Sequence, residues 1–181
     1  IHNKMVMTLN NTDLGDVVQM GIPIAFGETP GKVQGPRAAT ATDITLAPLP
    51  QTKNAGTANM PPPLAGIRIL EITNLIAGPT AGRLLADLGA DVIKLEPLTG
   101  DLSRPIGRTY FYNLNFNKRS VSVNTSTDEG KQVVQRIASS CDALLANLRP
   151  GATARMGIGL DADPNMIEAH LTGYGNTGPY F

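Results

Sequence analysis

The sequence predicts an α/β fold in which helices flank a parallel sheet. From Leu64 onward, short apolar runs alternate with amphipathic stretches, and turns rich in glycine and proline separate them. The first of these units has the order strand, helix, strand over residues 67–95. Because such alternation builds a parallel sheet with ligands beyond the carboxyl ends of its strands, we expect any binding site at that edge.

The first strand is predicted at residues 67–72 (IRILEI), which are apolar except for Arg68 and Glu71. A loop over residues 73–78 follows it. Pro79 then occupies an expected first helical position, where its missing N–H group is tolerated.

The first helix is predicted at residues 81–88, with Gly89 as its C-terminal cap. Residues 91–95 (DVIKL) form the second predicted strand. Together these elements make a βαβ unit, for which a right-handed crossover is expected. Further along, Thr127 is the predicted N-cap of a helix. The remaining elements are expected, in order, as a polar loop at 96–117, a strand at 120–124, a strand at 143–146, a short helix through Arg155, and a strand at 166–172.

The chain divides by composition into three parts. Residues 1–37 are expected to be irregular. Residues 38–63 are rich in Ala, Thr, Pro and Asn and are predicted to be a linker, because they contain too little apolar area to offset ordering entropy. Residues 64–181 form the predicted domain. Since the chain starts with Ile1 and stops in a Gly-Pro turn, we expect it to be an internal fragment.

Charge and cysteine content exclude several classes of protein. Lys plus Arg and Asp plus Glu both number 15, so nothing favours nucleic acid or an anionic membrane as partner. Cys141 is the only cysteine, which rules out an internal disulfide and fits the reducing cytoplasm. No apolar run is long enough for a transmembrane helix, and no metal-ligand spacing is present. We therefore expect a cytoplasmic protein without a metal.

The first turn between strand and helix is the strongest physical indication of a site, because a helix N-terminus suits a phosphate. Gly78 and Gly82 are spaced GxxxG rather than GxGxxG, which argues against NAD. Glu96 follows the second strand, where an NAD-binding acid would lie. Ordinary turn geometry and close packing of helix on sheet are the commoner explanation of two such glycines.

Other candidate residues also have purely structural explanations. Lys118 and Arg119 are expected either to hold phosphates or to be a solvated strand entry. Asn147 is well placed to touch a ligand, although turn formation is the commoner role of such an asparagine. His170 and Cys141 are interpreted as packing residues. Five acids are interpreted as loop and cap residues: Asp101, Asp128, Glu129, Asp161 and Asp163.

Several motifs, in conserved order and spacing over residues 63–181, resemble the opening of class III CoA-transferases, the family of formyl-CoA transferase and carnitine CoA-transferase. They begin with Pro63–Thr73 (PLAGIRILEIT), Ala77-Gly78-Pro79 and Leu84–Pro97 (LLADLGADVIKLEP). They continue with Asn117–Val121 (NKRSV), Asn147–Gly151 (NLRPG), Met156-Gly157, Gly173-Tyr174-Gly175 and Thr177–Tyr180 (TGPY).

The resemblance implies an incomplete Rossmann-like domain, and a dimer of interlocked chains. It implies transfer of CoA from an acyl-CoA to a carboxylic acid through an aspartyl-CoA intermediate, which is covalent catalysis. By resemblance the aspartate lies beyond Phe181, so no catalytic residue is named. The implied CoA contacts are Ile76, Ala77, Val123, Asn124, Asn147, Leu148 and Arg155.

The sequence departs from the formyl-CoA-transferase pattern at positions near the expected ligand. Pro97 stands in place of an arginine, Ser126 in place of a lysine, and Ile76 in place of a glutamine. Residues 160–165 are shorter than the usual helix there. These changes leave CoA as the expected ligand but weaken the case for formyl-CoA or oxalate.

Residues 21–36 resemble the closing segment of the same family, which suggests two tandem copies in one chain. Three alternatives to the transferase remain open. An α-methylacyl-CoA racemase would share the fold and the CoA site. A non-catalytic copy in a tandem protein would keep CoA binding or only dimer structure. An NAD-binding domain is the third.

Overall fold

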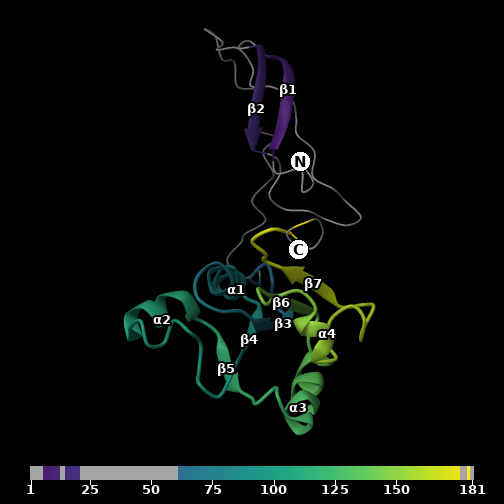
Figure 1. Ribbon diagram of the computed structural model, residues 1–181. Coiled ribbons are helices and arrows are strands. Elements are labelled where there is room, and N and C mark those ends of the chain that lie inside the picture. The colour runs from purple at the N-terminus through teal and green to yellow at the C-terminus, as the bar shows by residue number, and fades with distance from the viewer. Residues whose placement is uncertain (1–5, 13–14, 21–60, 176–178, 180–181) are drawn as a thin grey trace. The chain divides into compact units, whose positions relative to one another are not determined.

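A computed structural model describes residues 6–12, 15–20, 61–175 and 179. The described residues belong to two units, which contain a hairpin near the N-terminus and an α/β fold over residues 61–175 (Figure 1). The segment 21–36 that resembles a closing segment, and most of the predicted linker, lie outside the described residues.

The hairpin consists of β1 (Val6–Thr12) and β2 (Gly15–Met20), which pair antiparallel from Val6 with Met20 to Thr12 with Gly15. The expectation of an irregular segment over residues 1–37 is therefore wrong for these two strands. Their β-branched residues, such as Val6 and Val18, favour extended backbone even though Val18 is 67% exposed.

The α/β unit contains a five-stranded parallel sheet in the order β5-β4-β3-β6-β7. The first strand of the unit is thus central, and the direction of winding reverses between β3 and β6. This is the order of a Rossmann-type sheet, and it confirms the predicted fold class. The strands are β3 (Arg68–Ile72), β4 (Asp91–Glu96), β5 (Arg119–Ser122), β6 (Ala143–Ala146) and β7 (Ile167–His170).

The helix after β3 begins earlier than predicted. The helix α1 spans Ala77–Asp87, so Pro79 is its third residue rather than its first. The first four N–H groups of a helix have no partner inside it, so proline is tolerated at the third position as well. Gly89, just past the C-cap residue Leu88, has φ +100°, which matches its predicted role in ending the helix.

The polar loop predicted at 96–117 contains a helix that the sequence did not indicate. The helix α2 spans Arg108–Asn115 and buries only Phe111, so it lacks the repeated apolar positions that predict helices. The guanidinium of Arg104 lies 3.8 Å from the Phe111 ring centroid and anchors α2 from the preceding loop.

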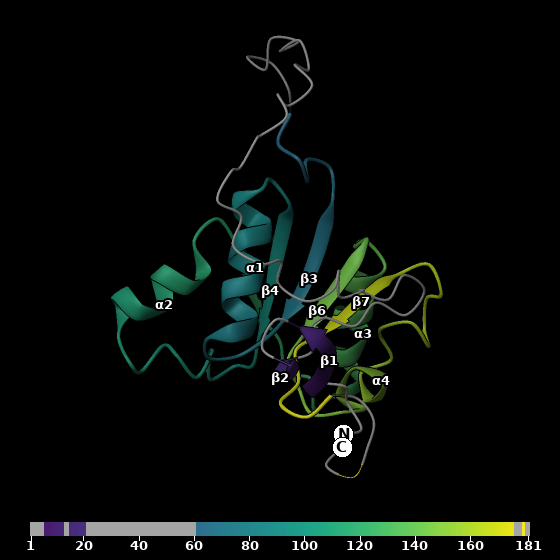
Figure 2. The same ribbon diagram turned by 90° about the horizontal axis from the view of Figure 1, so that it is seen from above.

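The two faces of the sheet are covered by different helices. Leu70 packs with Val134 of α3 (Asp128–Ala138), whereas its neighbour Ile69 packs with Ala86 of α1. Because alternate strand residues point to opposite faces, α1 and α3 lie on opposite sides (Figure 2). The hydroxyl of Thr127 accepts a hydrogen bond from the Gly130 amide and caps α3 as predicted. A short helix, α4 (Ala152–Arg155), follows β6.

Candidate functional site

The parallel sheet brings the predicted contact residues to its carboxyl edge. Ile76 and Ala77 follow β3, Asn124 follows β5, and Asn147 follows β6. Arg155 ends α4, which comes directly after the same edge. These residues therefore lie at the edge where a ligand is expected, whereas contact with a ligand stays a prediction.

Asn147 lies at the point where the winding of the sheet reverses. Its side-chain amide donates to the Asn74 carbonyl and its oxygen accepts from the Asn74 amide, both at 2.9 Å. Both polar groups of this side chain thus fix the backbone of the preceding turn. Asn147 therefore holds the backbone of Asn74, which lies two residues before Ile76.

The N-terminus of α1 is open at this edge. Its N-cap residue, Ile76, provides no capping hydrogen bond and is 55% exposed. Such a terminus presents unpaired N–H groups and partial positive charge. Gly78 and Gly82 are buried against Thr73 and Glu71 of the strand side, so their GxxxG spacing reflects close packing of helix on sheet.

A cavity of about 490 Å³ opens between the segment after β5 and α4. Lys131 and Arg155 bring two cations to it, and Ser126 lies beside them. Lys131 also pairs with Asp128 at 3.0 Å. The other lining residues are Thr125, Ala152 and Met156.

Two further predicted contacts have mainly a packing role. Val123 is 8% exposed and belongs to the core beneath α3, against which Leu148 also packs. Asn124 is exposed, and its side chain accepts from the Ser126 amide at 3.1 Å. Of the residues after β5, Asn124 rather than Val123 therefore presents its side chain at the surface.

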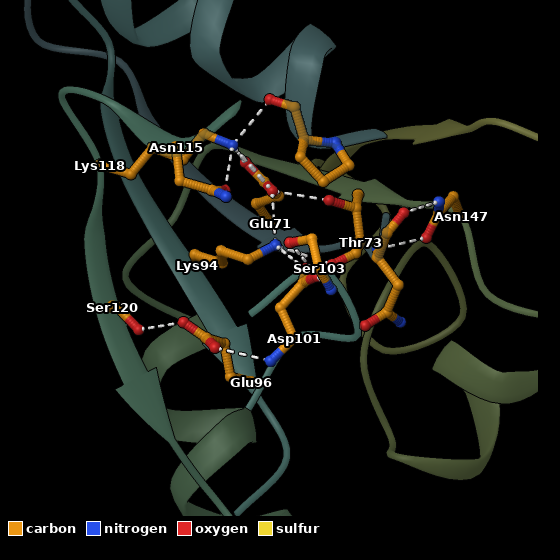
Figure 3. Close-up of polar contacts among 12 residues, drawn as sticks. Glu71, Thr73, Lys94, Glu96, Asp101, Ser103, Asn115, Lys118, Ser120 and Asn147 are labelled. Atoms are coloured by element: carbon orange, nitrogen blue, oxygen red, sulfur yellow. Dashed lines mark hydrogen bonds and ion pairs between the residues drawn. The ribbon is translucent and has the colours of Figure 1, made fainter. Parts of the chain in front are cut away.

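A buried ion cluster lies directly beneath the turn between β3 and α1 (Figure 3). It comprises Glu71, Lys94, Asp101 and Lys118, whose side chains are at most 1% exposed. Lys94 lies 3.2 Å from Glu71 and 2.8 Å from Asp101, and Lys118 lies 2.8 Å from Glu71. Two carboxylates and two ammonium groups balance, as buried charges require.

The ionisation of the cluster follows from its contacts. Burial favours the neutral acid at Asp101, but hydrogen bonds from Lys94 and Ser103 outweigh it and lower the pKa of Asp101. Burial lowers the pKa of Lys118 in spite of the attraction of Glu71. The carboxylate of Asp101 is thus held in its charged form.

Glu96 is closed off from any nucleotide. Arg104 donates to both of its oxygens, at 2.6 and 2.7 Å, and Ser120 donates at 2.6 Å. Burial opposes ionisation, yet these donors and the Asp101 amide lower the pKa of Glu96. An acid with its oxygens occupied in this way is not available to bind the ribose of NAD.

The interpretation of Asp101 as a simple loop residue is wrong, and so is the expectation of Lys118 as a phosphate ligand or a solvated residue. Both are buried in the ion cluster. The sequence carried one signal of the cluster, since Glu71 and Lys94 are opposite charges within two apolar strands. They are direct partners in the register of β3 and β4.

Arg119, which follows Lys118 in the sequence and was predicted with it, is exposed and forms an ion pair with Asp91 at 2.6 Å. Burial raises the pKa of the Cys141 thiol, which supports its interpretation as a packing residue. His170 pairs with Glu168 at 2.7 Å. Within the described residues, no group of three potential metal ligands occurs, and no helix is long and apolar enough to cross a membrane.

Comparison with known proteins points to one family. The model of CoA-transferase family III matches residues 64–181. The chain is 42% identical over 137 residues to the probable fatty acyl-CoA transferase Rv3272 of Mycobacterium tuberculosis, covering 68% of this chain and 35% of that protein. It is 43% identical over 129 residues to succinyl-CoA:glutarate CoA-transferase of Mus musculus, with coverage of 65% and 30%.

Formyl-CoA:oxalate CoA-transferase of Streptomyces avermitilis is 41% identical over 128 residues, covering 65% of this chain and 31% of the relative. The chain thus spans about a third of the length of the curated relatives it matches. Two crystal structures, of Rv3272 and of a CAIB/BAIF family protein from Brucella suis, each superpose with a TM-score of 0.63. Their sequence identities are 43% and 34%, and they cover 67% of this chain and 37% and 36% of their own chains.

Proposed function

The chain belongs to CoA-transferase family III, and from this membership we propose that it moves CoA from an acyl-CoA thioester to a carboxylic acid. The observation that carries the proposal is the pair of cations, Lys131 and Arg155, in the cavity at the carboxyl edge of the sheet. Phosphates need such cations, and ligands of open α/β sheets bind at this edge.

The cavity also bears on a departure from the family pattern. Ser126 stands where the formyl-CoA-transferase pattern has a lysine, and it lines the same cavity as Lys131. We propose that Lys131 supplies the positive charge that Ser126 lacks, together with Arg155. The pantetheine arm of CoA would then lead toward Ile76 and Ala77 at the open N-terminus of α1.

The proposed reaction uses an aspartate that we place beyond Phe181. Its carboxylate attacks the thioester carbonyl, which forms a mixed anhydride and releases CoA as a thiolate. The thiolate attacks the aspartyl carbonyl and releases the donor acid, leaving an aspartyl-CoA thioester. The acceptor carboxylate then repeats the sequence in reverse, so one hard exchange becomes several easier ones.

The substitution Arg155→Ala tests the ligand site. Loss of a charged hydrogen bond to phosphate is expected to weaken CoA binding by about 1–3 kcal/mol, a roughly 5- to 150-fold higher Kd. Isothermal titration of the intact protein with CoA measures it. Arg136→Ala, at the far end of α3, is the matched control and is expected to bind like wild type. Equal affinities for all three proteins, or binding of NAD instead of CoA, would refute the proposed site.

The type of reaction is decided by the products. Incubation with acyl-CoA and a labelled carboxylic acid is expected to yield labelled acyl-CoA. Exchange of the α-hydrogen with solvent deuterium, without transfer, would instead establish a racemase. CoA binding without either reaction would establish a non-catalytic copy.

A further inference from the structure

The turn between β3 and α1, residues 73–79, is held only in part by its own side chains, since the Thr73 hydroxyl donates to Glu71 at 2.6 Å. Leu75 and Ile76 are 43% and 55% exposed, so little apolar area is buried there. Leu75 also has φ +66°, a left-handed conformation that is unfavourable for a branched residue. Such strain persists only where the surroundings impose it.

The surroundings hold the backbone of this turn at both ends. The ammonium group of Lys94 donates to the Thr73 carbonyl at 2.8 Å, where the turn begins. The ammonium group of Lys118 donates to the Pro79 carbonyl at 2.7 Å, where α1 has started.

Between these ends, the Leu75 amide faces Asp101 Oδ1 at 3.4 Å. Asn147 binds the neighbouring Asn74 through both of its polar groups. The buried ion cluster, seen in Figure 3, thus contacts the backbone of the turn, whereas Leu75 and Ile76 of the turn are exposed.

We propose that Asp101, together with Lys94 and Lys118, positions the β3–α1 turn against the reacting end of acyl-CoA. This inference rests on the proposed function, because that function gives the turn its ligand. Buried ion pairs add little stability compared with apolar packing, so stability alone is a poor reason for four charges here. Fixed backbone geometry is what these charges provide.

The substitution Asp101→Asn keeps the volume of the side chain but changes its charge and hydrogen bonds. It therefore tests the contacts that hold the turn separately from packing. Asp101 Oδ1 accepts from Ser103 and faces Leu75, and Oδ2 faces Lys94 at 2.8 Å. An asparagine has only one acceptor oxygen, so its NH₂ group must face either the lysine or the amide donors. With the NH₂ group toward the amide donors, the Leu75 amide loses its acceptor. With the NH₂ group toward Lys94, the ammonium group that holds the Thr73 carbonyl loses its charged partner and faces a donor.

Glu96→Gln is the matched control. Glu96 is also a buried carboxylate paired with one cation, and it accepts from the Asp101 amide at 2.9 Å. It makes none of the contacts that hold residues 73–79, and the remaining oxygen of a glutamine can still accept from the Asp101 amide. Loss of stability alone would affect both variants, whereas loss of positioning would affect only Asp101→Asn.

The experiment measures three properties of wild type and of each variant. These are hydrogen–deuterium exchange of the peptide covering residues 73–79, the turnover of acyl-CoA, and the binding of adenosine 3′,5′-bisphosphate. For Asp101→Asn we expect at least 10-fold faster exchange in that peptide and about 10-fold lower kcat, with unchanged binding of the bisphosphate. Glu96→Gln is expected to match wild type in exchange of the turn and in kcat.

Ser103→Ala, which removes one donor to Asp101 and no charge, is the milder second variant. It is expected to change exchange and kcat in the same direction, and it replaces Asp101→Asn if that protein does not fold. Wild-type exchange in the turn for the folded Asp101 or Ser103 variant would overturn the inference, as would equal losses in Glu96→Gln. A wild-type protein without CoA transfer would overturn the proposed function alone, since the exchange comparison still decides whether the turn is held.

Discussion

Glu71 shows how a single residue links packing to the site. Its carboxylate is fully buried, accepts from the Thr73 hydroxyl at 2.6 Å and pairs with both lysines of the cluster. It has room only because Gly82 of α1 lacks a side chain, and a Cβ at that position would overlap the carboxylate. The helix can therefore approach the strand closely while a charged group lies between them.

The substitution Gly82→Ala is expected to destabilise the protein by about 1–3 kcal/mol, because overpacking forces the Glu71 carboxylate or α1 to move. Urea denaturation followed by circular dichroism measures this change. The control Gly173→Ala adds a methyl group where no atom lies within 4 Å, and should leave stability nearly unchanged. A Gly82→Ala protein as stable as its control would show that α1 is not in close contact with the ion cluster.

Single residues were predictable where the local chain decides their role. The N-cap Thr127 and the helix-ending Gly89 depend on the backbone of their own turn. The role of Asp101 depends instead on Lys94, which lies on another element. A loop aspartate has no local mark of burial, and so its part in the cluster was not predicted.

At the scale of elements, strands were predicted better than the polar helix and the hairpin. Residues 143–146 were predicted with the observed bounds because an apolar run between turns has few other structures. The helix α2 buries only Phe111, and none of the described side chains of β1 and β2 is fully buried, so these elements lack the buried positions on which prediction depends. Their contacts with other residues, such as Arg104 on Phe111, have no local signature.

The loop after β4 is tied to the sheet by Glu96 and Asp101, which makes its stability dependent on pH. Both carboxyl groups have a pKa below the ordinary values of 4.5 and 3.8. Between the folded and the ordinary pKa the unfolded chain binds more protons, so the free energy of unfolding falls as pH falls. This contribution is complete above about pH 5 and is lost progressively below it.

Glu96→Gln is expected to flatten the fall in the free energy of unfolding below about pH 5. Urea denaturation at a series of pH values measures the slope. Glu129→Gln, at an exposed position in α3, controls for the loss of one carboxylate. A Glu96→Gln profile parallel to that of wild type would contradict the ion pair with Arg104.

At the scale of the whole molecule, the proposed function depends on the topology of the α/β unit. The class of fold and the edge that carries the site were predictable, because alternating strands and helices leave few arrangements of a parallel sheet. The cavity was not predictable, since Thr125 and Arg155 line it together only when the fold brings α4 near the segment after β5. Neither residue has a local pattern that points to the other.

The central claim is that CoA binds along the carboxyl edge of the sheet. Hydrogen–deuterium exchange of the intact protein with and without CoA tests it most directly. CoA is expected to protect peptides covering residues 74–80, 124–131 and 147–156, and to leave the opposite edge at residues 64–68 and 139–142 unchanged, with no effect of NAD. Protection confined to the opposite edge, equal protection by NAD, or no protection at saturating CoA would contradict the account.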